Sequence, residues 1–165
     1  MNDQEADRLI HTEDPASVER GLEYLRASAE ANPDDAGRWF IYGGGLDFSD
    51  RAEEAIVAYG RVFDIGVEAL SPEDRPRIYV QAGSTLRNLG RLAEARRLLE
   101  EGRRRFPEFR AITAFLALVA VSEGEDRRAI DLLFAVLLAN CSDDSLEHYR
   151  RALTWYASEI RVDRP

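Results

Sequence analysis

The sequence predicts an all-α protein in which antiparallel pairs of helices stack one after another as a helical repeat. Three observations predict this fold. A set of aromatic, small and apolar residues with fixed spacing occurs three times in the 165-residue chain. A glycine or an aspartate follows at the same place in each set, where a turn between two helices favours such residues. Helix-start signals, in which a capping residue precedes a proline, occur ahead of the apolar rows.

The first segment, residues 1–33, is expected to form a degenerate helix pair. Asp14 followed by Pro15 indicates the start of its second helix, because aspartate caps helix N-termini and proline is favoured at the first helical position. Gly21 stands where the later pairs carry an alanine. The apolar row of this helix comprises Val18, Leu22 and Leu25.

Three repeats are expected at residues 36–69, 76–109 and 110–142. Each contains six marker residues with the same internal spacing, and the sets are offset by 40 and then by 34 residues. The sets are Trp39, Gly43, Leu46, Asp50, Ala55 and Tyr59; Tyr79, Gly83, Leu86, Gly90, Ala95 and Leu99; and Thr113, Ala117, Ala120, Gly124, Ala129 and Leu133.

Small residues are expected where the two helices of a pair cross, because a bulky side chain there would force them apart. Gly90 and Gly124 are expected in a left-handed turn between the helices, and Asp50 takes this place in the first repeat. The predicted crossings bring Gly43 to Ala55, Gly83 to Ala95 and Ala117 to Ala129.

The first repeat is longer because of the segment GVEALSPED, which is expected to be helical on both sides. Ser71 followed by Pro72 predicts a helix N-terminus, with the proline at the first helical position. Pro76 predicts a bend or a fresh helix start, since proline cannot donate a backbone hydrogen bond.

The last segment, residues 143–162, is expected to be a helix that covers the exposed end of the last repeat. Asp144 and Glu147 match the spacing of a capping box. Trp155 lies off the apolar stripe of this helix, and we expect it to be buried by packing of the chain's end. The stripe comprises Leu146, Tyr149, Leu153, Tyr156 and Ile160.

These spacings resemble the tetratricopeptide repeat, a helix-turn-helix unit of about 34 residues. Pro33 and Pro107 match the proline that closes such a repeat. The runs YGGGLDF, AGSTLRNLGRLAEA and ITAFLALVAVSEG are similar to short bacterial proteins that consist of these repeats alone. The resemblance implies one domain over residues 1–165, a right-handed superhelix of about nine helices with a C-terminal capping helix, and it supplies no catalytic residues.

The resemblance also implies that the first helix of each pair lines a concave groove, and that a peptide segment or partner protein binds there. The third repeat would contribute Ala111, Ala114, Phe115, Leu118 and Val121, which the terminal helix is expected to cover. The predicted binding residues are Phe40, Gly44 and Phe48 from the first repeat, and Arg77, Gln81, Ser84, Arg87 and Asn88 from the second.

The partner is expected to carry acidic or carboxylate groups, because arginine binds carboxylates through two parallel hydrogen bonds. Aromatic and arginine residues are also enriched in interface hot spots. The lysine and asparagine clamp by which some tetratricopeptide proteins hold chaperone tails is absent here. Its places are taken by Phe40, Gly44, Gln81, Ala111 and Phe115.

Other site chemistries are disfavoured, and we expect no catalysis, cofactor or metal. Gly43, Gly44 and Gly45 lack the strand and the lysine of a phosphate-binding loop. The acidic residues around Asp50 do not match a calcium loop, and Ser84 has no histidine at an equivalent position. The residues His11, His148 and Cys141 are too few and too dispersed for a metal site.

The charge pattern limits the class of partner that the protein can bind and suggests an alternative function. All 22 basic residues are arginines, and the net charge of −9 disfavours nucleic acid. No stretch predicts a membrane span or a signal peptide, so we expect a cytoplasmic protein. Residues 1–74 carry −12 and residues 75–110 carry +6, so the alternative is a structural protein that self-associates into homo-oligomers through these two surfaces.

Overall fold

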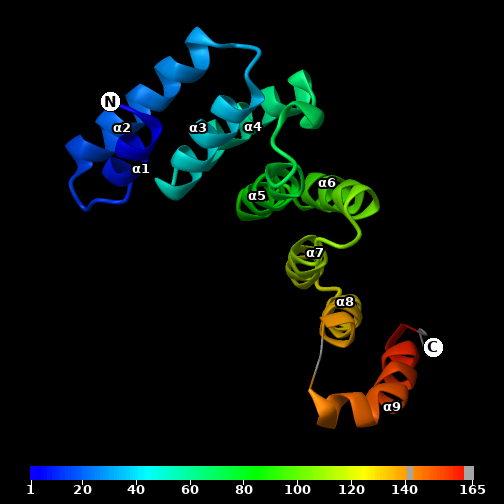
Figure 1. The fold of residues 1–165 in the computed structure, drawn as a ribbon. Helices are drawn as coiled ribbons and strands as arrows, with labels where there is room; N and C mark the ends of the chain where they lie inside the picture. The colour runs from blue at the N-terminus through cyan, green and yellow to red at the C-terminus, as the bar shows by residue number, and fades with distance from the viewer. Residues whose placement is uncertain (141–142, 162–165) are drawn as a thin grey trace. The chain divides into compact units, whose positions relative to one another are not determined.

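The computed structural model describes residues 1–140 and 143–161, and all regular structure within them is helical (Figure 1). Cys141 therefore lies outside the described residues. The purely helical structure of the described residues confirms the predicted all-α fold. The helices are α1 (Asp3–Ile10), α2 (Pro15–Ala31), α3 (Ala36–Phe48), α4 (Ala52–Ile65), the short 3₁₀ helix η1 (Val67–Ala69), α5 (Asp74–Asn88), α6 (Leu92–Arg105), α7 (Ala111–Ser122), α8 (Asp126–Asn140) and α9 (Asp144–Arg161).

Contacts between the helices divide the chain into two compact units, Met1–Gly90 and Arg91–Pro165. In the first unit α1 packs on α2, α2 on α3, α3 on α4, and α4 on α5. In the second unit α6 packs on α7, α7 on α8, and α8 on α9. Helices that follow one another in the sequence are therefore also neighbours in space within each unit, as a helical repeat requires.

Two glycines let the helices of the first unit approach closely. A Cβ atom at Gly21 would lie 2.8 Å from the backbone oxygen of Ala6, which explains why this position of α2 does not hold the expected alanine. A Cβ atom at Gly43 would lie 2.5 Å from the ring of Tyr59. The small residue is therefore required at the α3–α4 crossing as predicted, although the side chain that it meets belongs to Tyr59 rather than to Ala55.

The turns between helices adopt the predicted left-handed conformation. Gly90 and Gly124 have φ angles of +74° and +76°, and Asp50 has φ of +58° at the equivalent place. Asp50 is the one non-glycine residue with positive φ in the described part of the chain. An L side chain is strained in this region, so the first repeat carries a cost that the other two avoid.

The start of α5 differs from the prediction. The helix begins at Asp74, so Pro72 is not its first residue, although the hydroxyl of Ser71 does accept a hydrogen bond from the Asp74 backbone nitrogen at 3.2 Å. Pro76 occupies the first turn, where backbone N–H groups have no partner within the helix. Proline is tolerated there, and Pro76 accordingly accompanies a fresh helix start.

The terminal helix α9 packs through only part of the predicted apolar stripe. Ala157 is buried, and Leu146 and Leu153 are half-buried on the same face. Leu146 and Leu153 belong to the predicted apolar stripe, whereas its members Tyr149 and Tyr156 are 60% and 61% exposed and do not lie on the packing face. Spacings of seven and four residues place Leu146, Leu153 and Ala157 along one line of the helix, and the small Ala157 allows close approach to α8. Ile160 lies outside the described side chains.

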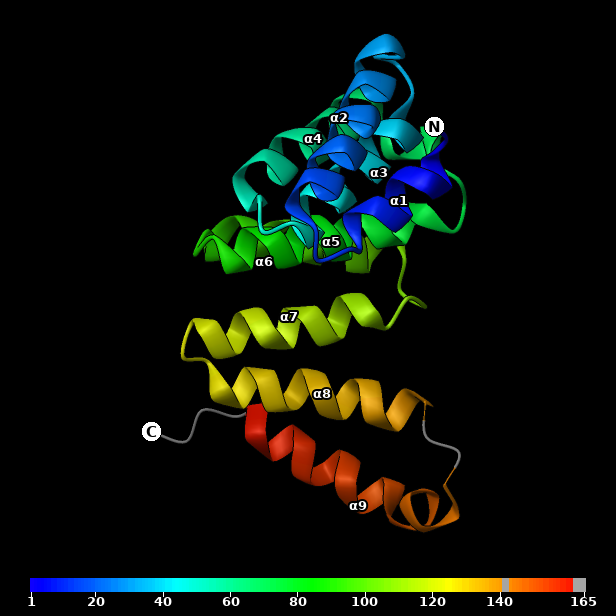
Figure 2. The same ribbon diagram turned by 90° about the vertical axis from the view of Figure 1, so that its left-hand side faces the viewer.

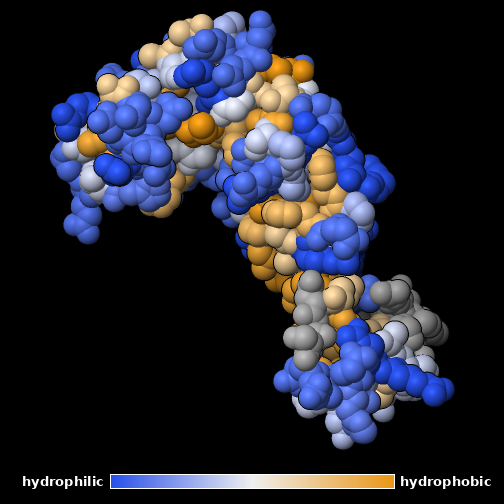
Figure 3. Space-filling model, viewed as in Figure 1, coloured by the Kyte–Doolittle hydropathy of each residue, from blue (hydrophilic) through white to orange (hydrophobic). Residues whose placement is uncertain are grey.

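Three further expectations about the chain's end are corrected. The carboxylate that caps α9 belongs to Asp143 rather than Asp144, since its Oδ1 accepts hydrogen bonds from the backbone nitrogens of Ser145 and Leu146 at 2.9 and 3.2 Å. Trp155 is 57% exposed rather than buried. The helix α9 packs on α8 (Figure 2), and Leu118 and Val121 of α7, which it was expected to cover, are 43% and 51% exposed. Figure 3 shows the hydrophobic area over α7 and α8.

Candidate functional site

The residues predicted to bind a partner all belong to α3 and α5, which contact each other within the first unit. Their spacings of three and four residues place most of them along one face of each helix. We call this region the α3–α5 surface. It comprises Phe40, Gly44, Asp47 and Phe48 of α3 and Arg77, Gln81, Ser84, Thr85, Arg87 and Asn88 of α5.

The three consecutive glycines of α3 have different surroundings. A Cβ at Gly43 would collide with Tyr59, and a Cβ at Gly45 would lie 3.0 Å from Ile10 and 3.2 Å from Leu25. A Cβ at Gly44 would have only Gln81 Oε1 nearby, at the ordinary contact distance of 3.9 Å. Close packing therefore requires glycine at the first and third positions and does not require it at Gly44.

A polar network joins the three helices beneath this surface. Tyr59 of α4 donates a hydrogen bond to Gln81 Oε1 at 3.1 Å. The hydroxyl of Thr85 is fully buried and lies 2.9 Å from both Asp47 Oδ2 and the backbone oxygen of Gln81. These bonds fix the side chain of Gln81 and tie α5 to α3.

Asp47 is a half-buried carboxylate at the centre of the surface. Burial raises its pKa above the ordinary value, the hydrogen bond from Thr85 opposes this rise, and the nearby charge of Asp50 adds to it. Among the described residues no arginine forms an ion pair with Asp47. The site thus contains a carboxylate that has lost part of its hydration without gaining a cation.

The aromatic residues of the surface differ in accessibility. Phe48 is 58% exposed, and its ring lies against the ring of His11 from α1 with their centroids 4.0 Å apart. Phe40 is only 9% exposed and packs near Tyr59, with ring centroids 6.4 Å apart. Phe48 therefore offers apolar area to a partner, as does the exposed Ile41 about two turns earlier on α3, whereas Phe40 supports the surface from within.

The arginines of the surface have partners within the chain. Arg77 pairs with Glu73 at 2.5 Å and with Asp74 at 3.3 Å, which precede it by four and three residues at the start of α5. Arg87 donates a hydrogen bond to the side chain of Asn88 at 3.4 Å. Ser84 is half-buried and Asn88 is exposed. The charge of Arg77 is therefore already balanced by two carboxylates.

Sequence reasoning considered Asp47 only as one of the acidic residues around Asp50, and it included neither Asp47 nor Thr85 in the binding site. A signal was nevertheless present, because Asp47 follows Gly44 by three residues and Thr85 follows Gln81 by four. These spacings place each residue beside a predicted binding residue on its own helix. Sequence spacing alone does not reveal that the two side chains meet across the helix pair.

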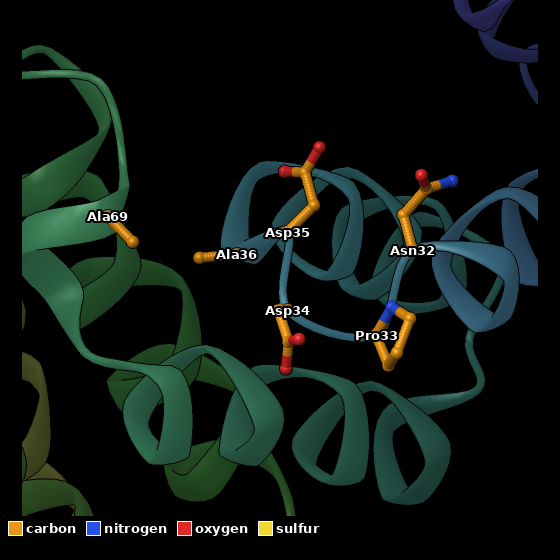
Figure 4. Close-up of a pocket in the computed structure, with 6 residues that line it drawn as sticks. All are labelled: Asn32, Pro33, Asp34, Asp35, Ala36 and Ala69. Carbon is orange, nitrogen blue, oxygen red and sulfur yellow. The ribbon is translucent and has the colours of Figure 1, made fainter.

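A hollow of about 520 Å³ lies elsewhere in the first unit, at the loop between α2 and α3 (Figure 4). Its lining includes Asn32, Pro33, Asp34, Asp35, Ala36 and Ala69. Asp35 caps α3, since its Oδ1 accepts hydrogen bonds from the backbone nitrogens of Gly37 and Arg38. Figure 4 shows the carboxylates of Asp34 and Asp35 pointing away from one another. This hollow therefore brings together no pair of reactive groups.

Two other kinds of feature are absent from the described residues. In the part of the chain that the structure describes, no group of three or more His, Cys, Asp or Glu side chains is arranged to hold a metal ion. Among the same residues, no helix is long and apolar enough to cross a membrane.

Comparison with known proteins identifies the family. A family model described as Tetratrico peptide repeat matches residues 37–160. Comparison with curated proteins gives no match. The family match spans well over half of the chain, and the described residues form consecutive helix pairs. The chain therefore belongs to the tetratricopeptide repeat family.

Proposed function

We propose that the chain is a noncatalytic protein-interaction module that binds a peptide segment or a partner protein on the α3–α5 surface. Tetratricopeptide repeats generally mediate interactions between proteins, which supports the class of function. The observation that carries the choice of surface is the combination of Gly44, a helix glycine that intramolecular packing does not require, with the exposed Phe48 one turn further along the same helix.

A glycine inside a helix costs about 1 kcal/mol relative to alanine, because it loses more conformational freedom on folding. Gly43 and Gly45 offset this cost by close packing, and Gly44 does not. A position without a side chain lets another backbone approach the helix closely. The exposed Phe48 lies one turn further along α3 and supplies the apolar contact that an interface needs.

The described chemistry of the surface supports binding rather than catalysis. The histidine of the first unit, His11, stacks on the ring of Phe48. The hydroxyls of Tyr59 and Thr85 are held in structural hydrogen bonds. The groups present can donate, accept and pack, which is the chemistry of recognition.

The test uses peptides selected on the full-length protein from a phage-displayed library of random dodecapeptides. The selected peptides are synthesised with a fluorophore, and their Kd is measured by anisotropy. We expect Gly44→Leu to weaken binding by at least about tenfold, because its side chain occupies the space left for the partner backbone. Circular dichroism checks that the variant is folded.

Gly60→Leu is the matched control. Gly60 also lies inside a helix, in α4, and a Cβ there would have no neighbour within 4 Å. The two variants therefore make the same substitution at positions with similar freedom. Equal Kd values for Gly44→Leu and Gly60→Leu, or a selection that enriches no peptide, would contradict the proposal.

Self-association is the second candidate, and the distribution of charge favours it. The first unit carries net negative charge, while α6 ends in the exposed Arg103, Arg104 and Arg105. These surfaces of two copies attract each other at low salt. Light scattering at 20 and 500 mM salt should then show an oligomer that dissociates as salt rises, whereas a monomer at both concentrations excludes this function.

A further inference from the structure

The net negative charge of the molecule comes from the unit that carries the α3–α5 surface. Residues 1–90 contain 18 acidic residues and nine arginines, which gives a net charge of −9. Residues 91–165 contain 13 of each, which gives a net charge of zero. A unit with this excess attracts cationic partners and repels acidic ones.

The arginines of the first unit leave Asp47 without compensation. Arg77, the arginine closest in sequence to Gln81, pairs with Glu73 and Asp74. Arg51, which follows the α3–α4 turn, pairs with Glu19 at 3.2 Å and Glu54 at 2.7 Å. These two arginines are thus each balanced by two carboxylates, and in the described residues the bond from Thr85 is what the side chain of Asp47 receives from the chain.

We propose that the α3–α5 surface recognises a basic peptide segment, in which an arginine or lysine pairs with Asp47 and a neighbouring apolar side chain packs on Phe48. This inference rests on the proposed function and names the chemistry of its partner. The backbone of the segment passes over Gly44, which lies about one helical turn before both Asp47 and Phe48 on α3.

The geometry favours a cation over the carboxylate partner that the arginine residues suggest from sequence. A carboxylate brought to this surface would meet the half-buried charge of Asp47 and an arginine, Arg77, that two acidic side chains already hold. A guanidinium or ammonium group would instead supply the charge that Asp47 lacks. A charge-assisted hydrogen bond of this kind is stronger than a neutral one, most of all where water is partly excluded.

The first test compares charge at one peptide position and one protein position. A selected peptide is synthesised with its arginine and with citrulline, a neutral isostere, and Kd is measured on the wild-type protein and on Asp47→Asn. We expect citrulline to weaken binding to the wild type by about tenfold. On Asp47→Asn we expect the two peptides to bind alike, because the pairing charge is already gone.

Asp50→Asn is the matched control, since it removes the same charge three residues away on an exposed turn. Asparagine also tolerates the positive φ of this residue. If Asp47→Asn and Asp50→Asn raise the Kd of the arginine peptide equally, binding depends only on the overall electrostatic field of the unit, and the proposed pairing with Asp47 is wrong. The inference is also wrong if citrulline and arginine peptides bind the wild type equally.

A pH series gives an independent readout. The elements around Asp47 present Thr85 and Gln81 from α5, which do not titrate, Asp50 from the turn, and His11 from α1 beside Phe48. Affinity for the arginine peptide should rise as pH increases through the acidic range, where Asp47 ionises, and this rise should be reduced in Asp47→Asn. An unchanged pH profile in the variant contradicts the pairing.

The outcomes separate the inference from the proposed function. Peptides that lose affinity on Gly44→Leu but contain no arginine or lysine would uphold the surface and overturn the basic partner. Peptides that are insensitive to Gly44→Leu would overturn the surface itself, whatever their charge.

Discussion

The three consecutive glycines of α3 have separable effects on stability. A methyl group at Gly43 would lie 2.5 Å from the ring of Tyr59, so we expect Gly43→Ala to lower the free energy of unfolding by about 1–2 kcal/mol despite the better helix propensity of alanine. Gly44→Ala should raise it by up to about 1 kcal/mol, because the added methyl group meets only the end of Gln81. Urea unfolding of both variants measures the two effects. A loss of stability in Gly44→Ala would mean that this glycine is required by the fold.

Asp47 makes the stability of the first unit depend on pH. Burial raises the pKa of Asp47 above that of the unfolded chain, so the folded state holds this proton more tightly. The resulting stabilisation is complete below the unfolded pKa and is lost as pH rises through the folded pKa. The free energy of unfolding of Asp47→Asn minus that of the wild type should therefore be larger at pH 7 than at pH 3. Urea unfolding at both pH values checks this, and an equal difference at each would show that Asp47 titrates normally in the fold.

For the candidate site, helical spacing in the sequence predicts which residues share a helix face, but it does not predict how deeply each side chain is buried. The register of the repeats places Gly44 and Gln81 on facing helices, and the structure brings them together. The depth of a side chain does not follow from register, because it depends on neighbours from other helices. Phe40 and Phe48 are two turns apart on one helix, yet Phe40 lies against Tyr59 and Phe48 is exposed.

The turn between α3 and α4 is a strained version of the turn between α7 and α8. Asp50 adopts φ of +58°, where Gly124 adopts +76° at the equivalent place. We expect Asp50→Gly to stabilise the protein by about 0.5–1 kcal/mol, since glycine adopts this conformation without steric conflict. Gly124→Ala should destabilise it by about 1–2 kcal/mol for the opposite reason. Thermal unfolding of each variant provides the measurement.

The charge of Asp50 requires its own control in this experiment. Asp50 also raises the pKa of Asp47, so a glycine at this position changes both the backbone and the field. Asp50→Asn removes the charge and keeps a side chain at Cβ. If Asp50→Asn stabilises the protein as much as Asp50→Gly does, the gain comes from charge, and the turn is not strained.

At the scale of whole helices, their existence was easier to predict than the face through which each one packs. The capping signal at Asp14 and Pro15 gives the start of α2, because those interactions are local. In α9 the predicted stripe contains Leu153, Tyr149 and Tyr156, but the helix packs through Leu153 together with Ala157 and leaves the two tyrosines exposed. The choice depends on the shape of α8, since a small residue permits an approach that two tyrosines prevent.

At the scale of the molecule, the separation of charge between the two units predicts how a basic peptide associates. The excess of −9 lies within residues 1–90, so it acts over a distance of about 10 Å at 0.1 M salt and over less at higher salt. We expect the association rate of the arginine peptide to fall roughly tenfold between 20 and 500 mM salt. The dissociation rate should change little, because it depends on contacts already made. Stopped-flow fluorescence measures both rates.

Two variants separate this long-range field from the contact at Asp47. Neutralising the exposed Glu13, Glu23 and Glu30 to glutamine reduces the excess without touching the α3–α5 surface, so it should lower the salt dependence of association and leave dissociation unchanged. Asp47→Asn removes only one charge from the field and should mainly speed dissociation. If instead the triple variant speeds dissociation, the peptide binds along α1 and α2. The combination of a steering field and a single half-buried carboxylate would then fail as an account of recognition.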